Sequence, residues 1–473
     1  MRACVLFVLV TLPVSALLPG LAVAEPPERP DVLFVAVDDL NDWIGCMGGH
    51  PQALTPNLDR LAERSMLFTS AYCAAPACNP SRVAVMTGRA PWSTGVYLNS
   101  HPWRPVLPEA VTLPQHFRGH GYWAGGSGKI YHGRYPDPES WDTYWPDQKR
   151  NKPNDPQPES RPLNGIPRTA HFDWGPVEAP PSDMGDWKVA DWVSERLGES
   201  ADSPRFLACG IFRPHLPWYV PPEYFAPFPL SPEKPPVRED DLDDVPPVGI
   251  AMAKPDGDHR RVLRHDQWEP AIRGYLASVH FADAMLGRVF DALDRSGRAD
   301  STIIVLWSDH GWHLGEKRHW RKFALWERAN RVPLMILVPP GVSPALPAGT
   351  RAGARCDRPV SLLDLYPTLS QLCGLPDRPE WDGHSLIPLL QDPEAQPERA
   401  VVMTHGRKNH AVRQGPWRLI RYADGSEELY DHRSDPHEWT NLADREDLAQ
   451  VQETLRRHLP EQDAPSAPRD KER

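Results

Sequence analysis

Two continuous apolar runs, Asp31–Val37 and Thr302–Trp307, are each followed closely by a pair of polar residues. Apolar, β-branched runs of this length are typical of strands that are buried on both faces of a parallel sheet. In such sheets ligands bind beyond the carboxyl ends of the strands. We therefore expect the two polar pairs to lie close together, although they are far apart in the sequence. The pairs are Asp38-Asp39 and Asp309-His310.

Helical patterns separate these and other predicted strands. Thr55-Pro56 is a helix start, with Thr as N-cap and Pro at the first helical position. Apolar residues between Ile272 and Leu293 fall at helical spacing, and Leu362–Leu372 has the same character. Phe206–Ile211 and Val332–Val338 are further candidate strands. Strands that alternate with helices predict an α/β fold with a large, doubly wound, mostly parallel sheet.

The pattern changes after Pro388. Four short strands separated by turn signals predict a small antiparallel sheet in a C-terminal α+β subdomain. We therefore expect a main domain at 25–388, a subdomain at 389–460 and a disordered polar tail at 461–473. Two Pro-rich segments, 145–181 and 229–258, are predicted to be ordered loops over the site. The four strands are Val401–Thr404, His410–Arg413, Trp417–Tyr422 and Glu427–Tyr430.

The first 24 residues have the features of a signal peptide. An apolar run from Ala3 to Val23 ends in Ala22-Val23-Ala24, a cleavage-like triplet. The alternative is an uncleaved membrane anchor, which Pro13, Pro19 and Gly20 disfavour. We expect an exported protein, secreted or periplasmic, with no stable membrane span after cleavage.

Composition limits the partners. The formal charge of −11 disfavours a broad basic face for nucleic acid or anionic lipid, so an anionic ligand requires a local cationic pocket. Although the chain has 56 Pro, its 18 Trp and 40% hydrophobic residues indicate a globular protein. The cysteines beyond the signal peptide follow no metal-site spacing; one or two disulfide bridges are possible, and the sequence does not indicate their pairing.

The most informative segment is Cys78-Asn79-Pro80-Ser81-Arg82, followed by Met86-Thr87-Gly88-Arg89. It matches the signature C-x-P-S-R with its downstream Thr-Gly-Arg, and here the chain resembles the type I sulfatases of the alkaline phosphatase superfamily. The resemblance implies an alkaline-phosphatase-like fold. It also implies that a maturation enzyme oxidises Cys78 to formylglycine (3-oxoalanine), whose hydrate attacks sulfur. For an isolated cysteine, a structural thiol would be the better interpretation.

The residues that follow Cys78 in this segment suit a reaction with an anionic sulfate. Pro80 suits a first helical turn that begins after Cys78, which places the nucleophile at a helix N-terminus, where free N–H groups favour an anionic sulfate. Arg82 is expected to hold the aldehyde hydrate, since its charge cannot be titrated away.

The resemblance also implies a calcium site. Asp38, Asp39 and Asp309 are hard oxygen ligands at strand ends, and the modified Cys78 completes the set with His310. A single Asp at a strand end more often forms a turn or a cap. Many sulfatases carry Asn where this chain has His310, whereas the iduronate-2-sulfatase type has His, so whether His310 ligates the metal stays open.

Four further residues match that subgroup. The resemblance implies that Lys129 and His132 contact the formylglycine, and that His215 and Lys322 contact sulfate and protonate the leaving oxygen. Such cations stabilise the negative charge that develops during sulfuryl transfer. Singly, each Lys would more often be a solvated surface residue and each His a packed one.

Together these observations predict a secreted, formylglycine- and calcium-dependent sulfatase that hydrolyses a sulfate ester on a carbohydrate and is similar to iduronate-2-sulfatases. One alternative is a phosphoester or phosphonate hydrolase of the same superfamily. Another is an inactive protein that binds sulfated glycans. The sequence does not indicate which sugar or which sulfate position is recognised.

Overall fold

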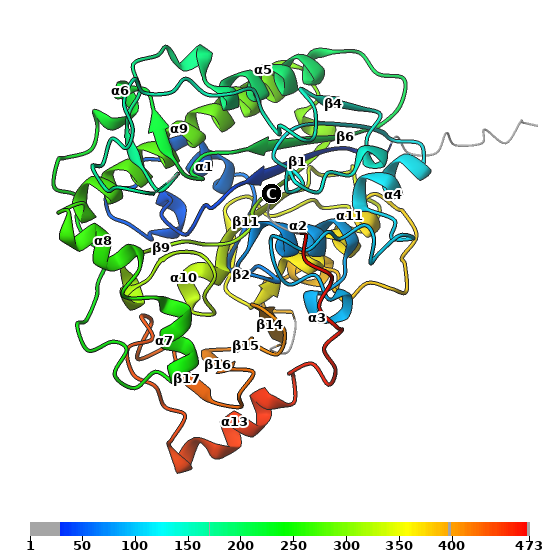
Figure 1. Ribbon diagram of the computed structural model, residues 1–473. Helices are drawn as coiled ribbons and strands as arrows, with labels where there is room; N and C mark the ends of the chain where they lie inside the picture. Colours follow the sequence, from blue (N-terminus) through cyan, green and yellow to red (C-terminus); the bar gives the residue numbers. More distant parts are fainter. Residues whose placement is uncertain (1–28, 170, 396–398, 471–473) are drawn as a thin grey trace, which may run out of the picture.

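The computed structural model describes residues 29–169, 171–395 and 399–470 (Figure 1). The predicted signal peptide, 1–24, lies outside the described residues. The centre of the molecule is a nine-stranded sheet with the order β12-β2-β11-β8-β1-β6-β3-β4, in which β13 also pairs with β2. Its strands are β1 (Asp31–Val37), β2 (Met66–Tyr72), β3 (Trp123–Gly128), β4 (Thr143–Trp145), β6 (Arg205–Ile211), β8 (Thr302–Ser308), β11 (Arg331–Leu337), β12 (Ala354–Cys356) and β13 (Val360–Ser361).

The sheet is mostly parallel, as predicted. β1 pairs in parallel with β6 and β8, whereas β11 is antiparallel to both of its neighbours, β8 and β2. Every residue of β1 is buried. Leu33, Val35 and Val37 contribute to the apolar core on one face, and the alternate residues contribute to the core on the other. Burial on both faces explains why this strand is a continuous apolar run and not an alternating one.

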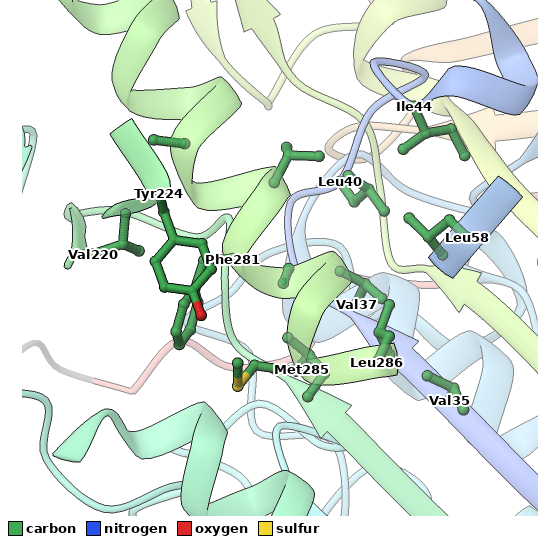
Figure 2. Packing of buried hydrophobic residues seen from close by; sticks show 14 of the residues in the cluster. Val35, Val37, Leu40, Ile44, Leu58, Val220, Tyr224, Phe281, Met285 and Leu286 are labelled. Carbon is green, nitrogen blue, oxygen red and sulfur yellow. The ribbon is translucent and has the colours of Figure 1, made fainter. Parts of the chain in front are cut away.

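Helices cover both faces. The long helix α9 (Trp268–Arg295) packs on one face together with α1 (Pro56–Ala62) and α5 (Gly185–Gly198). Figure 2 shows Met285 and Leu286 of α9 beside Val35 and Val37 of β1. The opposite face is covered by α2 (Cys78–Thr87), α4 (Leu113–Gly119) and α11 (Leu365–Leu372). The arrangement is the predicted doubly wound fold.

Shorter elements connect these layers or extend from them. They are η1 (Gly45–Met47), α3 (Pro91–Thr94), η2 (Pro138–Ser140), β5 (Trp174–Pro176), η3 (Pro181–Asp183), β7 (Trp218–Val220), α6 (Pro222–Phe225), α7 (Pro247–Ala253), α8 (Asp258–Arg264), η4 (Ala299–Ser301), β9 (His313–Leu314), η5 (Glu316–Arg318), β10 (Trp320–Arg321), α10 (Glu327–Asn330), η6 (Leu362–Asp364), α12 (Ile387–Gln391) and η7 (Glu446–Leu448).

The C-terminal part forms the predicted small antiparallel sheet, in the order β14-β15-β16-β17, with α13 (Ala449–Arg456) packed against it. It lies at the bottom of the molecule in Figure 1. The four strands are β14 (Ala400–Thr404), β15 (His410–Gln414), β16 (Trp417–Arg421) and β17 (Glu427–Asp431).

A buried ion cluster joins this small sheet to the rest of the protein. Arg418 of β16 contacts Glu327 at the start of α10, and its Nε lies 2.9 Å from Glu438 Oε1. His432 Nε2 lies 3.1 Å from the same Glu438 oxygen. Although Glu327, His432 and Glu438 have the residue types of a metal site, the guanidinium of Arg418 already pairs with both carboxylates. We therefore interpret the cluster as a structural one.

Two expectations about loops differ from the structure. The segment after Pro460 was expected to be disordered, but residues 461–470 run back past α3 (Figure 1). Backbone N–H groups of Ala464, Ala467 and Asp470 donate to carbonyls of residues 92–100, and Ala467 is buried. The polar composition suggested disorder. Backbone groups make these contacts, and side-chain composition does not reveal them.

The second difference concerns the Pro-rich segment 229–258. Its apolar residues Leu242, Val245 and Ala253 pack against the C-terminal sheet and not over the site. Because this segment has no regular periodicity, its sequence did not indicate which surface its apolar side chains cover. The described cysteines are all unpaired, and none of the described helices has the length and apolarity needed to cross a membrane.

Candidate active site

The predicted site residues meet at one edge of the large sheet. Asp38 and Asp39 follow β1, Asp309 and His310 follow the adjacent β8, and Lys129 follows β3. These strands are parallel, so their carboxyl ends share one edge. The expectation that the two polar pairs lie together is confirmed, since the backbone N–H of Asp39 donates to Asp309 Oδ1 over 3.1 Å.

Cys78 is the first residue of α2 and is 1% exposed. Its Sγ lies 2.9 Å from Lys322 Nζ, 3.4 Å from His310 Nε2 and 3.7 Å from Lys129 Nζ. Pro80 lies in the first turn, as expected. The thiol is therefore in contact with two ammonium groups at a helix N-terminus, an environment suited to negative charge.

Arg82 contacts the carboxylates and backbone carbonyls around Cys78. Its Nε donates to Asp309 Oδ2 over 2.8 Å and its Nη2 to Asp38 Oδ1 over 3.1 Å, while Nη1 donates to the carbonyls of Lys129 and Ile130. The side chain is fully buried. Since its donors contact the ends of three strands, Arg82 orients the carboxylates of the site, and no donor contact with Cys78 is seen among the described residues.

Asp39 is held in an uncommon backbone conformation, with a φ of 62°. Its carbonyl accepts a hydrogen bond of 2.9 Å from the hydroxyl of Tyr275 on α9. Burial raises the pKa of Asp39 to about 7, against the opposing charge of Lys322. Its Oδ2 is buried and has no hydrogen-bond partner among the described residues. A strained, buried carboxylate with an unsatisfied oxygen is typical of a cation ligand.

His310 is fully buried, and its Nδ1 lies 3.1 Å from the carbonyl of Gly311, which fixes the proton on that nitrogen. Burial lowers the pKa of His310, so the ring is neutral and Nε2 carries a lone pair. Nε2 lies 3.5 Å from Asp39 Oδ1 and 3.5 Å from Asp309 Oδ2. Nε2 is thus available as a ligand for a cation that lies among these carboxylates.

These side chains fit a divalent cation. Ligand atoms of Asp38, Asp39, Cys78 and His310 all lie within 4.8 Å of one another. Asp309 is beside them, with Oδ1 accepting from two backbone N–H groups and Oδ2 accepting from Arg82. Three carboxylates with one imidazole form a mainly hard ligand set, which suits Ca²⁺ better than a soft metal.

Two lysines supply positive charge. Lys129 contacts Asp38, and Lys322 Nζ lies 2.6 Å from Asp39 Oδ1. Burial alone would lower both lysine pKa values, but the facing carboxylates outweigh it and raise the pKa of each. Both side chains are therefore ammonium groups at neutral pH, aimed at the position of Cys78.

The two remaining predicted histidines line the same site. His215 Nδ1 lies 2.7 Å from the carbonyl of Leu216, and its Nε2 lies 4.0 Å from Asp39 Oδ2. Burial and the charge of Lys129 hold the pKa of His215 well below its usual value. His132 is beside the lysines, and burial with the charges of Lys129 and Lys322 lowers its pKa to about 3. No hydrogen bond joins His132 to Cys78 among the described residues.

Sequence reasoning missed three residues that support the site. The Ser81 hydroxyl donates to the carbonyl of Asp309, and Tyr275 holds the backbone of Asp39. The ring of Phe212 packs against that of His215, with 4.7 Å between centroids, and Lys129 Nζ lies 5.2 Å from the Phe212 centroid. Ser81 belongs to the recognised motif and could have been inferred, whereas nothing in the pattern marks Tyr275 or Phe212.

Comparison with known proteins shows a family match over most of the chain. Residues 30–375 match the family described as Sulfatase, and residues 315–464 match the C-terminal region of N-sulphoglucosamine sulphohydrolase. A sulfatase of Formosa agariphila is 38% identical over 92% of this chain and 87% of its own length. Mouse iduronate 2-sulfatase is 32% identical over 74% of this chain and 69% of its own. The crystal structure of phosphonate monoester hydrolase of Agrobacterium radiobacter shares the fold, with a TM-score of 0.72, 24% identity and coverage of 91% and 94%.

Proposed function

The chain belongs to the sulfatase family, and from this premise we propose that it is an exported, calcium-dependent enzyme that hydrolyses sulfate esters of a carbohydrate, using a formylglycine made from Cys78. The observation that carries the proposal is the position of the Cys78 thiol, in contact with Lys322, Lys129 and His310 at the start of α2. When present, the hydrated aldehyde supplies one hydroxyl to attack sulfur and another that lets sulfate leave.

The residues around Cys78 suit a sulfate group. Lys129 and Lys322 are protonated before the reaction, and they face the position at which negative charge develops on the sulfate oxygens. Their geometry is fixed before substrate binds, because Asp38 and Asp39 hold the two ammonium groups. Such preorganised charge in a buried site avoids reorganisation during the reaction.

Calcium fits the same arrangement and would be held by Asp38, Asp39, Asp309 and the group at position 78, with His310 Nε2 as the nitrogen ligand. When bound, it supplies positive charge to the attacking oxygen and to the sulfate. The fit rests on the unsatisfied Oδ2 of Asp39 and on the proton-free Nε2 of His310.

The leaving alcohol requires a proton. Lys322 is a charged donor, whereas His215 presents an unprotonated Nε2 when its Nδ1 donates to Leu216. We therefore assign the proton donation to Lys322, and assign to His215 the acceptance of a hydrogen bond from the substrate or water.

The relatives support a sulfated carbohydrate as the substrate, since one of them is named for action on iduronate 2-sulfate. Support for export comes from the signal-peptide pattern at 1–24. N-terminal sequencing of protein collected outside the cytoplasm should give Glu25 as the first residue, and an intact Met1 would contradict export by cleavage.

The decisive experiment is mass spectrometry of active protein made with its maturation enzyme. The peptide with Cys78 should lose sulfur and gain an aldehyde oxygen. Cys73, which lies five positions earlier and whose thiol faces Ala329 and Asn330 in the core, should remain a thiol in the same sample. Sulfate release from an aryl sulfate should exceed phosphate release from the matched aryl phosphate. Active enzyme with an unmodified Cys78, or with a preference for phosphate, would overturn the proposal.

A further inference from the structure

A cavity of about 450 Å³ lies beside Phe212, three residues before His215. One wall comes from the Pro-rich segment 145–181 and the other from the loop after β6. The segment was expected to lie over the site, and its residues 150–161 do reach this neighbouring cavity.

The lining of the cavity is strongly cationic. Four of the lining side chains are basic, namely Arg150, Lys152, Arg161 and Arg213. Among the described residues that line the cavity, Asp155 is the single acidic one. The lining therefore carries three positive charges in excess, within a chain whose formal charge is −11. A concave surface of one charge sign concentrates ligands of the opposite sign.

The four cations have two different roles. Lys152 and Arg213 are buried, and both contact Asp155 Oδ2 at 2.6 Å, so they form the fixed wall. Arg150 and Arg161 are exposed. Arg150 lies 3.7 Å from an exposed carboxylate, and Arg161 donates to the neutral Gln157 over 2.9 Å and makes no salt bridge within the described part of the chain. Their guanidinium groups are able to bind an anion.

A second carboxyl group, that of Asp186, lies behind the wall and is not among the residues that line the cavity. Asp186 accepts hydrogen bonds from the backbone N–H groups of Phe212 and Arg213, and burial raises its pKa. His171 also lines the cavity, and burial with the charge of Arg321 lowers its pKa, so it adds no charge at neutral pH.

Phe212 connects the cavity to the active site. Its ring centroid lies 5.2 Å from Lys129 Nζ and 4.9 Å from Lys152 Nζ, which add to an upper limit of about 10 Å between the two nitrogens. A disaccharide spans such a distance. The wall of the cavity at Lys152 therefore lies within the length of a disaccharide from Lys129 of the active site.

We propose that this cavity binds a second anionic group of the substrate, a carboxylate or a further sulfate on the sugar next to the reacting ester. The inference rests on the proposed sulfatase function and specifies its substrate class as polyanionic glycans. The two exposed arginines supply the affinity, and the buried Lys152-Asp155-Arg213 group holds the wall in place.

The test compares inhibition of aryl sulfate hydrolysis by three disaccharides. They share a sulfated hexose and differ in the second residue, which is glucose, glucuronate or glucose 6-sulfate. Wild-type enzyme should bind at least one doubly anionic disaccharide roughly tenfold more tightly than the neutral one. In Arg150→Gln and Arg161→Gln this preference should fall about fivefold in each, with an unchanged KM for the aryl sulfate. The response to glucuronate or to glucose 6-sulfate identifies the preferred anion.

Arg445→Gln provides the matched control, since Arg445 is an exposed arginine of the C-terminal part that pairs with Asp447. Equal inhibition by all three disaccharides, with normal aryl sulfate turnover, would overturn the cavity proposal and leave the sulfatase intact. The same holds if Arg445→Gln reduces the preference as much as the cavity variants do. Wild-type protein without activity on any sulfate ester would overturn both proposals.

Discussion

The ammonium group of Lys322 lies 2.6 Å from Asp39 Oδ1 and also reaches Cys78 Sγ at 2.9 Å. One cation therefore bridges a predicted metal ligand and the predicted nucleophile. Because Lys322 follows the short strand β10 and lies far from both partners in the sequence, the bridge depends on the folded loop. The N–H of Phe323 donates to the carbonyl of Pro76, which fixes this loop beside the start of α2.

Replacing this cation should impair catalysis more than folding. Lys322→Met keeps the length of the side chain and removes its charge, so we expect kcat for an aryl sulfate to fall by about 10²- to 10³-fold. Lys188→Met on α5 is the control, because the Lys188 ammonium is exposed and donates to the backbone carbonyl of Asp183. Activity within twofold of wild type, measured on protein with an unchanged unfolding temperature, would contradict the role of Lys322.

Calcium should stabilise the protein through Asp39. Binding to the folded state alone adds about 2.7 kcal/mol at a ligand concentration 100 times Kd, which corresponds to a rise of a few degrees in Tm. Asp39→Asn should reduce this rise, because the carboxylate with the unsatisfied Oδ2 is lost. Differential scanning calorimetry with calcium, magnesium or chelator measures the effect. Asp191→Asn, at a half-buried site on α5, should respond like wild type.

How much of this site the sequence could predict differs between its parts. The strands that carry Asp38 and Asp309 were recognisable because burial on both faces demands apolar, β-branched residues. β3 was not recognised, because its sequence WAGGSG lacks such residues. Gly128, with φ of 84°, allows close approach to β6, since a Cβ there would lie 1.8 Å from the carbonyl oxygen of Gly210. The glycines that prevent β3 from being recognised in the sequence thus also allow the close packing that positions Lys129.

The role of Arg82 shows another limit of sequence reasoning. Its type and spacing within the motif identified it as a site residue, but its partners are set by three strands that converge only in the fold. The contacts of the two Pro-rich segments could not be predicted either, since neither segment has a periodicity that marks its buried side. Chemistry carried by a local motif was therefore predictable, whereas long-range partners were not.

The buried ion cluster predicts a large stability effect without a direct catalytic one. Arg418→Met would leave Glu327 and Glu438 buried without their main cation, and we expect unfolding to become easier by about 3 to 5 kcal/mol. Arg421→Met, on the same strand but exposed, should cost less than about 1 kcal/mol. Urea unfolding measures both. Equal destabilisation by the two variants would show that the cluster does not hold the C-terminal sheet in place.

Asp283 on α9 should make stability depend on pH. Its carboxylate accepts hydrogen bonds from the backbone N–H groups of Asn57 and Leu58 at the start of α1. Burial nevertheless raises its pKa from 3.8 to about 6. Between these values the folded state binds more protons than the unfolded chain, so the contribution of Asp283 to stability falls as the pH rises from about 4 to 6.

Asp283→Asn cannot ionise and still offers an oxygen to the same N–H groups, so the variant should lose this pH dependence. Relative to wild type, its free energy of unfolding should increase by about 2 to 3 kcal/mol between pH 4 and pH 7, at about 1.4 kcal/mol per unit of pKa shift. Urea unfolding at several pH values gives the difference directly, and Asp291→Asn, exposed on the same helix, serves as the control. A difference that stays constant over this range would mean that Asp283 is already ionised in the folded protein at pH 4, and that its hydrogen bonds to α1 outweigh its burial.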